Sequence, residues 1–145
     1  MRYSHPVHIV SWEDEVLTLR AIRTEVFIHE QQVPESLEWD EFDAISTHVL
    51  ASNSDGQPVG TARLLPDGHI GRMAVLKEWR GKGYGSAMLQ KMLEELRNRH
   101  KQKVMLNAQA SAVKFYEKFG FKVSGEEFLE AGILHVKMIL FLKSN

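Results

Sequence analysis

Apolar residues recur at helical spacing in two long parts of the chain. From residue 12 to about residue 29 they follow one another at intervals of three and four, and Ser11 with Asp14 is typical of a helix N-cap. A second part, ending near His100, carries pairs of Met and Leu at the same spacing. The spacing predicts two amphipathic helices. The apolar positions that define them are Val16, Leu19, Ile22, Val26, Met88, Leu89, Met92, Leu93 and Leu96.

β-prone runs between turn residues predict strands in the rest of the chain. Asp55-Gly56 is a hairpin turn between two of these runs. A shorter helix is expected over 110–118, and Gly120 stands where a helix C′ glycine belongs. Residues 29–43 break the periodicity and form either an irregular segment or a short helix. The expected strands are 8–10, 47–52, 58–65, 70–75, 104–107, 121–123 and 135–142.

The order of these elements predicts the fold class. A strand, a helix, three antiparallel-prone strands, a helix, a strand, a helix and two closing strands follow one another. This order implies an α/β (α+β) fold with a mixed, mostly antiparallel twisted sheet of about six to seven strands, flanked by about four helices. No repeat, linker or low-complexity segment divides the chain, so residues 1–145 are expected to form a single domain.

Composition narrows the function classes. Hydrophobic residues make up 43% and charged residues 26% of the 145 positions, which is ordinary for a globular protein. The formal charge of -1 and the pI near 6.7 argue against nucleic acid as a partner. The chain has no apolar run long enough for a secretory signal or a membrane span, so no membrane partner and a cytoplasmic location are expected.

The same composition limits the chemistry. A chain without cysteine has no disulfide, no thiolate nucleophile and no cysteine metal site. The seven histidines show no spacing typical of metal ligands. No metal is therefore expected.

A glycine-rich loop, R-G-K-G-Y-G over residues 80–85, joins the strand at 70–75 to the second long helix. Glycines before a helix N-terminus let backbone N–H groups converge on an anion, which predicts a phosphate or pyrophosphate site. The alternative is a solvated turn with ordinary basic residues. The Walker order is missing, and Met88 stands where a dinucleotide fingerprint needs Gly or Ala. The pattern that fits is R-x-x-G-x-G.

A second cluster of polar and aromatic residues runs from Asn107 to Phe121 and reads N-A-x-x-x-A-x-x-F-Y-x-x-x-G-F. Asn107, at the end of a predicted strand, offers a side-chain amide for hydrogen bonding. Phe115 and Phe119 lie four residues apart and are expected to bury one face of the short helix. Tyr116 lies beside them and carries a hydroxyl that can either reach a cleft or cap the edge of the core.

These two motifs resemble those of the GNAT superfamily of N-acetyltransferases. In that family R-x-x-G-x-G is the loop that binds the pyrophosphate of coenzyme A, and the second motif is a further coenzyme A element. The element order is also that of the GNAT fold, so the resemblance covers nearly the whole chain. It implies an acetyl-CoA-dependent N-acetyltransferase that moves an acetyl group to a primary amine of a small molecule or peptide by direct attack.

The resemblance also implies roles for individual residues. The strand at 70–75 is expected to splay from its neighbour, so that the backbone of Met73 and Val75 contacts the pantetheine of acetyl-CoA, the cosubstrate. Tyr116 is expected to protonate the leaving thiolate as a general acid. The implied cofactor-binding residues are Met73, Ala74, Val75, Arg80, Gly81, Lys82, Gly83, Tyr84, Gly85, Ser86 and Asn107.

The acyl acceptor is less well defined. Six acidic residues between 30 and 43 either line a pocket that attracts a cationic amine or form a solvated face. Their pattern, F-x-x-E-Q…P…E-x-D-x-x-D, resembles the ElaA/YjcF branch of the family. Glu30 is the expected base or amine-binding residue. Further candidates are His48 and His135 as a base through water, and Arg63 and Arg72 for an anionic group of the acceptor. The alternative is that the histidines are strand residues with satisfied rings and the arginines are solvated strand charges.

Two other functions are compatible with parts of the sequence. A non-catalytic acyl-CoA-binding regulatory module keeps the cofactor loop, but binding alone does not require Tyr116. A nucleotide-phosphate binder is disfavoured because the Walker lysine and serine are missing. The sequence is also compatible with a homodimer.

Overall fold

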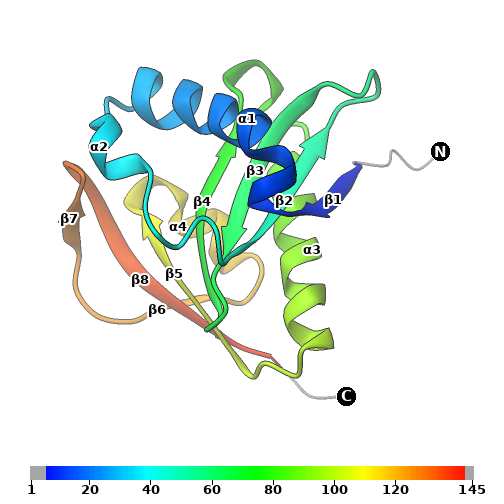
Figure 1. Cartoon of the computed structure of the whole chain (residues 1–145). Coiled ribbons are helices and arrows are strands. Elements are labelled where there is room, and N and C mark those ends of the chain that lie inside the picture. Colours follow the sequence, from blue (N-terminus) through cyan, green and yellow to red (C-terminus); the bar gives the residue numbers. More distant parts are fainter. Residues whose placement is uncertain (1–5, 143–145) are drawn as a thin grey trace.

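Within residues 6–142, which the computed structural model describes, eight strands form one twisted sheet and helices lie on both of its faces (Figure 1). The strands are β1 (Val7–Val10), β2 (Thr47–Ser52), β3 (Pro58–Leu64), β4 (His69–Val75), β5 (Lys103–Gln109), β6 (Lys122–Val123), β7 (Phe128–Glu130) and β8 (Ile133–Phe141). The α-helices are α1 (Trp12–Arg23), α2 (Glu35–Glu38), α3 (Tyr84–Asn98) and α4 (Val113–Glu117). A π-helix, η1 (Thr24–Glu30), continues α1, and short 3-10 turns, η2 (Lys77–Trp79) and η3 (Ala110–Ala112), precede α3 and α4.

The strand order is β1-β2-β3-β4-β5-β8-β6, with β7 paired to β8. Every pair is antiparallel except β4 with β5. That parallel pair is short, since only His69 with Met105 and Ile70 with Leu106 are in register. Beyond these residues the two central strands diverge.

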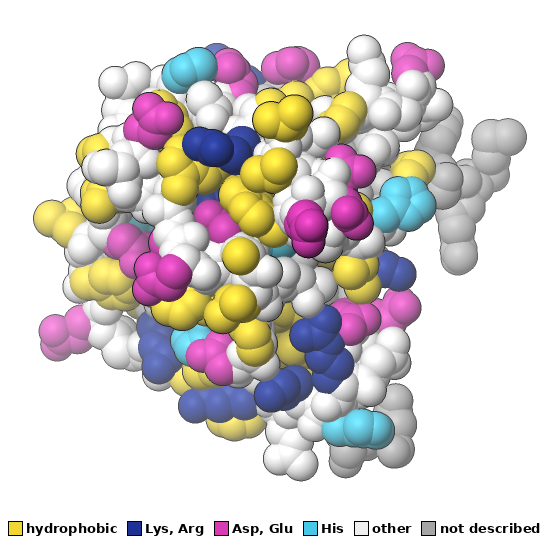
Figure 2. Space-filling model, in the orientation of Figure 1, with side chains coloured by type: hydrophobic (Ala, Val, Ile, Leu, Met, Phe, Trp, Pro, Cys, Tyr) yellow, Lys and Arg dark blue, Asp and Glu magenta, His cyan; other side chains and the backbone are white. Residues whose placement is uncertain are grey.

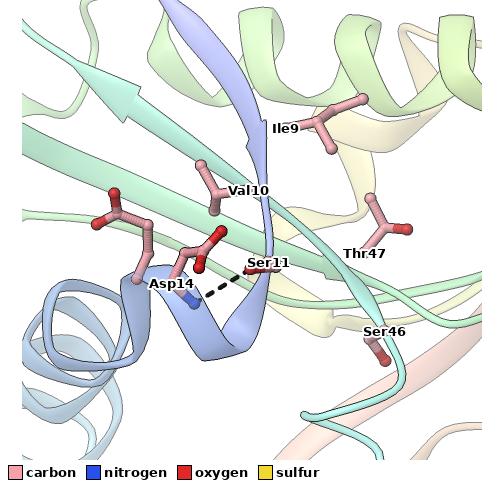
Figure 3. Close-up of a pocket in the computed structure, with 7 residues that line it drawn as sticks. Ile9, Val10, Ser11, Asp14, Ser46 and Thr47 are labelled. Atoms are coloured by element: carbon pink, nitrogen blue, oxygen red, sulfur yellow. Dashed lines mark hydrogen bonds between the residues drawn. The ribbon is translucent and has the colours of Figure 1, made fainter.

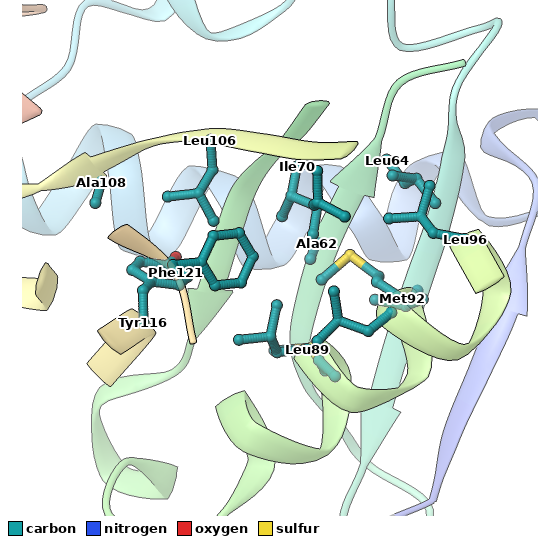
Figure 4. Packing of buried hydrophobic residues seen from close by; sticks show 14 of the residues in the cluster. Ala62, Leu64, Ile70, Leu89, Met92, Leu96, Leu106, Ala108, Tyr116 and Phe121 are labelled. Atoms are coloured by element: carbon teal, nitrogen blue, oxygen red, sulfur yellow. The ribbon is translucent and has the colours of Figure 1, made fainter. Parts of the chain in front are cut away.

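The larger part of the core lies between the sheet and α3. The Met and Leu pairs predicted to face inward are all buried, and they pack on alternate residues of β3, β4 and β5 such as Ala62, Ile70 and Leu106 (Figure 4). Each such side chain contributes roughly 1.5–3 kcal/mol by leaving water. Tyr116 and Phe121 close the same cluster beside α4.

The smaller part of the core lies on the opposite face of the sheet, under α1 and η1. Leu19, Ile22, Val26 and Phe27 are buried there against Leu50 and Ala74 of the sheet. The side chain of Ser11 accepts a hydrogen bond from Asp14 N–H at 3.1 Å, which is the predicted N-cap. The predicted helix from residue 12 to about 29 is therefore confirmed, although its last turns are π-helical.

The predicted fold class is confirmed, with three differences in detail. β7 was not predicted, because its hairpin turn uses Ala131 at φ 51, a residue that seldom occupies this region, before Gly132 at φ 77. The strand predicted to end at Asn107 continues to Gln109. The sheet consequently has eight strands in the described residues instead of six to seven.

Figure 2 shows how charge is distributed over one face of the molecule. Acidic side chains are spread over much of this face, hydrophobic ones lie between them, and basic side chains gather toward its lower part. Within residues 6–142 no helix has the length and apolar character needed to cross a bilayer.

Candidate active site

The glycine-rich loop lies between η2 and the N-terminus of α3. Gly81 (φ 74) and Gly83 (φ 92) occupy the left-handed region that favours glycine, and Gly83 is the N-cap residue of α3. No side chain caps this end, and the first turn of α3 contains no acidic residue, whereas that of α1 contains three. The positive end of the α3 dipole is thus left available to an anion.

A cavity of about 180 Å³ lies beside this loop. The start of α3 and α4 come close together at its wall, because an added Cβ on Gly85 would lie 3.5 Å from Phe115. Phe115 was predicted as a packing residue only, and Trp79 was not singled out, yet both line the cavity. The lining residues are Val75, Trp79, Arg80, Gly81, Gly83, Tyr84, Gly85, Ser86 and Phe115.

The divergence of β4 and β5 leaves backbone groups open at the same place. Residues 71–75 of β4 and 107–109 of β5 are not in register with one another. Leu76 N–H donates to Val59 O at 2.9 Å, so the adjacent pair of Gly60 and Val75 is non-hydrogen-bonded. The N–H and C=O of Val75 therefore point away from β3. The C=O accepts a hydrogen bond from Arg80 Nε, so the N–H is the group left open to the gap between β4 and β5.

Tyr116 reaches this gap from α4. Its hydroxyl donates to Met73 Sδ of β4 at 3.6 Å, and its ring packs edge-on against Phe115 and Phe121 (Figure 4). Burial raises the pKa of Tyr116 to about 12, because the phenolate would lose hydration. The hydroxyl is therefore protonated, as a hydrogen-bond donor or general acid must be.

Asn107 lies elsewhere than predicted. It is inside β5 and exposed, in register with Lys137 of β8. Its neighbours Leu106 and Ala108 face α3 and α4, so the alternation of the strand puts Asn107 on the α1 side of the sheet. The polar residue at the strand end is Gln109, whose Nε2 donates to Gln31 Oε1 at 2.9 Å. Extending the period of two from Val104 could have shown that Asn107 and Gln109 share a face.

Glu30 and Arg80 form one ion pair. Arg80 Nη1 and Nη2 donate to the two carboxylate oxygens of Glu30, both at 2.6 Å, and Arg80 Nε donates to Val75 O at 2.8 Å. The hydrogen bond and the charge of Arg80 hold the pKa of Glu30 below its usual value. The predicted base and a predicted phosphate contact are thus bound to each other.

Most of the predicted acidic acceptor pocket is neutralised. Glu38 and Asp43 are buried and hydrogen-bonded to Arg23 at 2.8 and 2.7 Å. Arg63 Nη1 donates to Asp40 Oδ1 at 2.7 Å and to Asp43 Oδ1 at 3.0 Å, and Arg72 lies 3.1 Å from Glu38. The sequence left open either a pocket for a cationic amine or a solvated face, and the buried, paired Glu38 and Asp43 form neither. Arg63 and Arg72 bind these carboxylates, which argues against both an anion-binding role and solvated strand charges. Only Glu35 and Glu41 of that segment are exposed without such a pairing.

The two histidines considered as bases differ in their surroundings. His48 is fully buried, and its Nε2–H donates to Asp43 O at 2.8 Å. It belongs to the buried charge cluster and cannot receive a proton from an acceptor. His135 is in register with Gln109, its Nδ1–H donates to Ile133 O at 2.7 Å, and its ring stacks on Phe128. Of the two, His135 lies closer along the sheet to the gap.

A second cavity, of about 420 Å³, lies at the junction of β1, α1 and β2 (Figure 3). It is lined by Ser11, Asp14, Ser46 and Thr47 among others, and none of the predicted site residues reaches it. Ser11 and Asp14 already serve as the N-cap of α1. Within residues 6–142 no group of three or more His, Asp or Glu side chains is arranged to hold a metal ion.

Comparison with known proteins gives consistent matches over almost the whole chain. Residues 11–142 match the acetyltransferase (GNAT) domain. The Bacillus subtilis protein YyaT is 37% identical over 130 residues, which cover 86% of this chain and 87% of YyaT. The N-acetyltransferase YjcF of the same organism is 36% identical over 131 residues, 88% of this chain and 93% of YjcF. A solved acyl-CoA N-acyltransferase from Pseudomonas aeruginosa superposes with a TM-score of 0.83 at 31% identity, covering 94% of this chain and 99% of that one.

Proposed function

Since the chain belongs to the GNAT family of acetyltransferases, and is therefore an acyl-CoA-dependent N-acyltransferase, we propose that it transfers an acetyl group from acetyl-CoA to a primary amine of a small molecule or peptide. The observation that carries the proposal is a convergence at one place. The uncapped N-terminus of α3, the open N–H of Val75 and the hydroxyl of Tyr116 all border the gap between β4 and β5.

The chain's own groups fit the cosubstrate. A diphosphate carries negative charge, and the glycine loop offers converging backbone N–H groups and a helix end free of acidic side chains. The open edge of β4 can hydrogen-bond an extended pantetheine as an added strand would. The residues proposed for this binding are Met73, Ala74, Val75, Arg80, Gly81, Lys82, Gly83, Tyr84, Gly85, Ser86 and Asn107, with Phe115 and Trp79 added as lining residues of the cavity.

Acetyl-CoA supplies an activated thioester, and the protein supplies orientation and a proton. Val75 N–H points into the gap and is suited to donate to the thioester carbonyl oxygen as negative charge develops there. The amine nitrogen forms the new bond to the carbonyl carbon, and the carbon–sulfur bond breaks. Tyr116 then gives its hydroxyl proton to the leaving sulfur, and it recovers a proton from the attacking nitrogen, which must lose one as the amide forms.

Glu30 is proposed as a residue of this site, but not as the base that takes a proton from the amine. Its bidentate pair with Arg80 lowers its pKa, and a carboxylate with a lowered pKa is a weaker base. The cytoplasmic location and the homodimer stay predictions.

Binding and turnover test the proposal in sequence. In a thermal-shift measurement, acetyl-CoA at about 100 times its Kd is expected to stabilise the protein by about 2.7 kcal/mol, CoA should also stabilise it, and ATP should not. Butyryl-CoA in the same measurement tests the preference for acetyl. Thiol release from acetyl-CoA is then followed over a panel of primary amines.

Each outcome has a separate meaning. Stabilisation by ATP but not by acetyl-CoA would contradict the proposal. Tight binding of acetyl-CoA with no thiol release on any amine would favour the non-catalytic acyl-CoA-binding module.

A further inference from the structure

Glu30, the last residue of η1, and Gln31, which follows it, are linked to the two strands that diverge beside them. Glu30 binds Arg80 through both carboxylate oxygens, and Arg80 in turn binds Val75 O at the end of β4. Gln31 accepts a hydrogen bond from Gln109, the last residue of β5, at 2.9 Å. One short stretch is thereby joined to both sides of the gap. The contacts lie five residues beyond the last registered pair on β4 and three beyond it on β5.

The side chain of Arg80 is fully engaged within the protein. Its Nε, Nη1 and Nη2 each donate to a protein oxygen, and the Nη contacts are the parallel, bidentate kind that fixes a guanidinium in one orientation. An arginine held in this way connects η1 to β4, although part of its side chain also lines the cavity. A phosphate at this loop is then bound chiefly by backbone N–H groups.

The part of η1 that carries Glu30 and Gln31 is anchored in the core. Val26 and Phe27 of η1 are buried in the core under α1. Gln31 N–H donates to Val26 O at 3.1 Å, the five-residue spacing of a π-helix, and Val33 N–H donates to Phe27 O at 2.8 Å. A π-helical turn shifts the residues that follow it relative to an α-helix, and such turns are frequent at functional sites. Here the shift brings Glu30 and Gln31 within reach of opposite strands.

We propose that Glu30 and Gln31 form a brace that sets the width of the gap between β4 and β5. The brace makes both residues positioning residues, which hold Val75 at the distance from Gln109 that an inserted thioester requires. This inference rests on the proposed function of the gap. It also assigns Arg80 to the brace, so that Arg80 serves acetyl-CoA binding by positioning Val75.

A double-mutant cycle distinguishes the brace from a direct phosphate contact. E30Q and R80Q each remove the ion pair, and both are expected to weaken acetyl-CoA binding about tenfold, the loss typical of one charge-assisted contact. Because the two residues act as one unit, E30Q/R80Q should bind no more weakly than R80Q alone, measured by calorimetry. If Arg80 binds phosphate directly, E30Q will leave the affinity unchanged or raise it while R80Q lowers it, and the brace is then wrong.

Hydrogen exchange in the protein without ligand gives a second test. E30Q and Q31A should raise backbone exchange in residues 70–76 and 106–112, the two sides of the gap. The matched control is E25Q, because Glu25 pairs with His29 on the same π-helix at 3.2 Å but touches neither strand. Equal exchange in E30Q, Q31A and E25Q would overturn the brace. If the wild-type protein fails to bind acetyl-CoA, the proposed function fails, and this exchange measurement still decides whether the brace exists.

Discussion

Two sets of charged residues differ in their surroundings. One is the buried charge cluster under α2, made of Arg23, Glu38 and Asp43, and the other is the ion pair of Arg80 and Glu30 beside the glycine loop. The side chains of Arg23, Glu38 and Asp43 are only 1–3% exposed, whereas those of Arg80 and Glu30 are 40% and 35% exposed. Trp12 and Trp39 cover Arg23, with their rings 5.4 and 5.0 Å from its guanidinium carbon. By contrast, Arg80 lines a cavity.

This difference separates residues that stabilise the fold from residues that serve the proposed binding site. A buried ion pair whose partner is removed leaves an uncompensated charge away from water, so its loss reduces the stability of the fold. A half-exposed pair at a cavity costs little stability when it is lost, because water replaces the partner. Residues under α2 should therefore affect unfolding and leave binding intact, and residues around the gap should do the opposite.

The largest expected effect is on stability. R23A leaves Glu38 and Asp43 buried with one fewer partner each and should lower the free energy of unfolding by about 3 kcal/mol, measured by urea denaturation. Acetyl-CoA affinity, measured well below the unfolding temperature, should not change. The control R99A removes the exposed pair with Glu95 and should cost under about 1 kcal/mol. If R23A is folded but binds acetyl-CoA poorly, the buried charge cluster also affects the binding site, and the separation of the two regions is wrong.

Tyr116 should show the opposite pattern. Y116F keeps the ring packed between Phe115 and Phe121 but removes the proton donor, so kcat for thiol release should fall about 100-fold with little change in stability. Because the pKa of Tyr116 is raised to about 12, the hydroxyl is protonated in the wild type, and the loss should be constant from about pH 6 to 9. Unchanged turnover at every pH would remove Tyr116 from the mechanism.

Patterns in the sequence were sufficient to predict the core and the fold class. The helical spacing of Met88 to Leu96 and the period of two in the strands depend on local burial, so they identified the core and the fold class correctly. The roles of the loop at 80–85 and of Tyr116 came from the resemblance of two motifs to those of GNAT enzymes, and they stay predictions. The structure then brings both to the same gap.

The charged residues were harder to interpret. Counting carboxylates between 30 and 43 could not reveal that three arginines lie opposite them, since Arg23, Arg63 and Arg72 come from three separate elements. Asn107 was misplaced for a similar reason, because the end of β5 is set by its pairing with β8 as far as His135. Long-range contacts decide both cases, and periodicity does not record them.

A glycine pair tests the cofactor loop at smaller cost. Gly81 and Gly56 both have positive φ, of 74° and 79°, and an added Cβ at either would meet nothing within 4 Å. G81A and G56A should therefore lose the same stability, about 1–2 kcal/mol from left-handed strain. Only G81A should weaken acetyl-CoA binding, by about tenfold, because its methyl group enters the space of the phosphate. Equal affinities in the two variants would show that this part of the loop is not the cradle.

The smallest expected effect is a pH dependence under α2. Burial, with the charges of Arg23 and Arg63, holds the pKa of His48 below its usual value, although the carbonyl and charge of Asp43 act the other way. The unfolded chain therefore takes up a proton near pH 6.5 that the folded protein does not, so stability falls as the pH drops below that value, by at most about 1.4 kcal/mol per pH unit. H48Q keeps a donor for Asp43 O but cannot titrate. Its stability between pH 8 and 5.5, measured by urea denaturation, should fall less than that of the wild type, while acetyl-CoA affinity stays the same in both. Parallel stability curves would mean that His48 is accessible to protons in the folded protein, and the buried cluster would then resemble the open one.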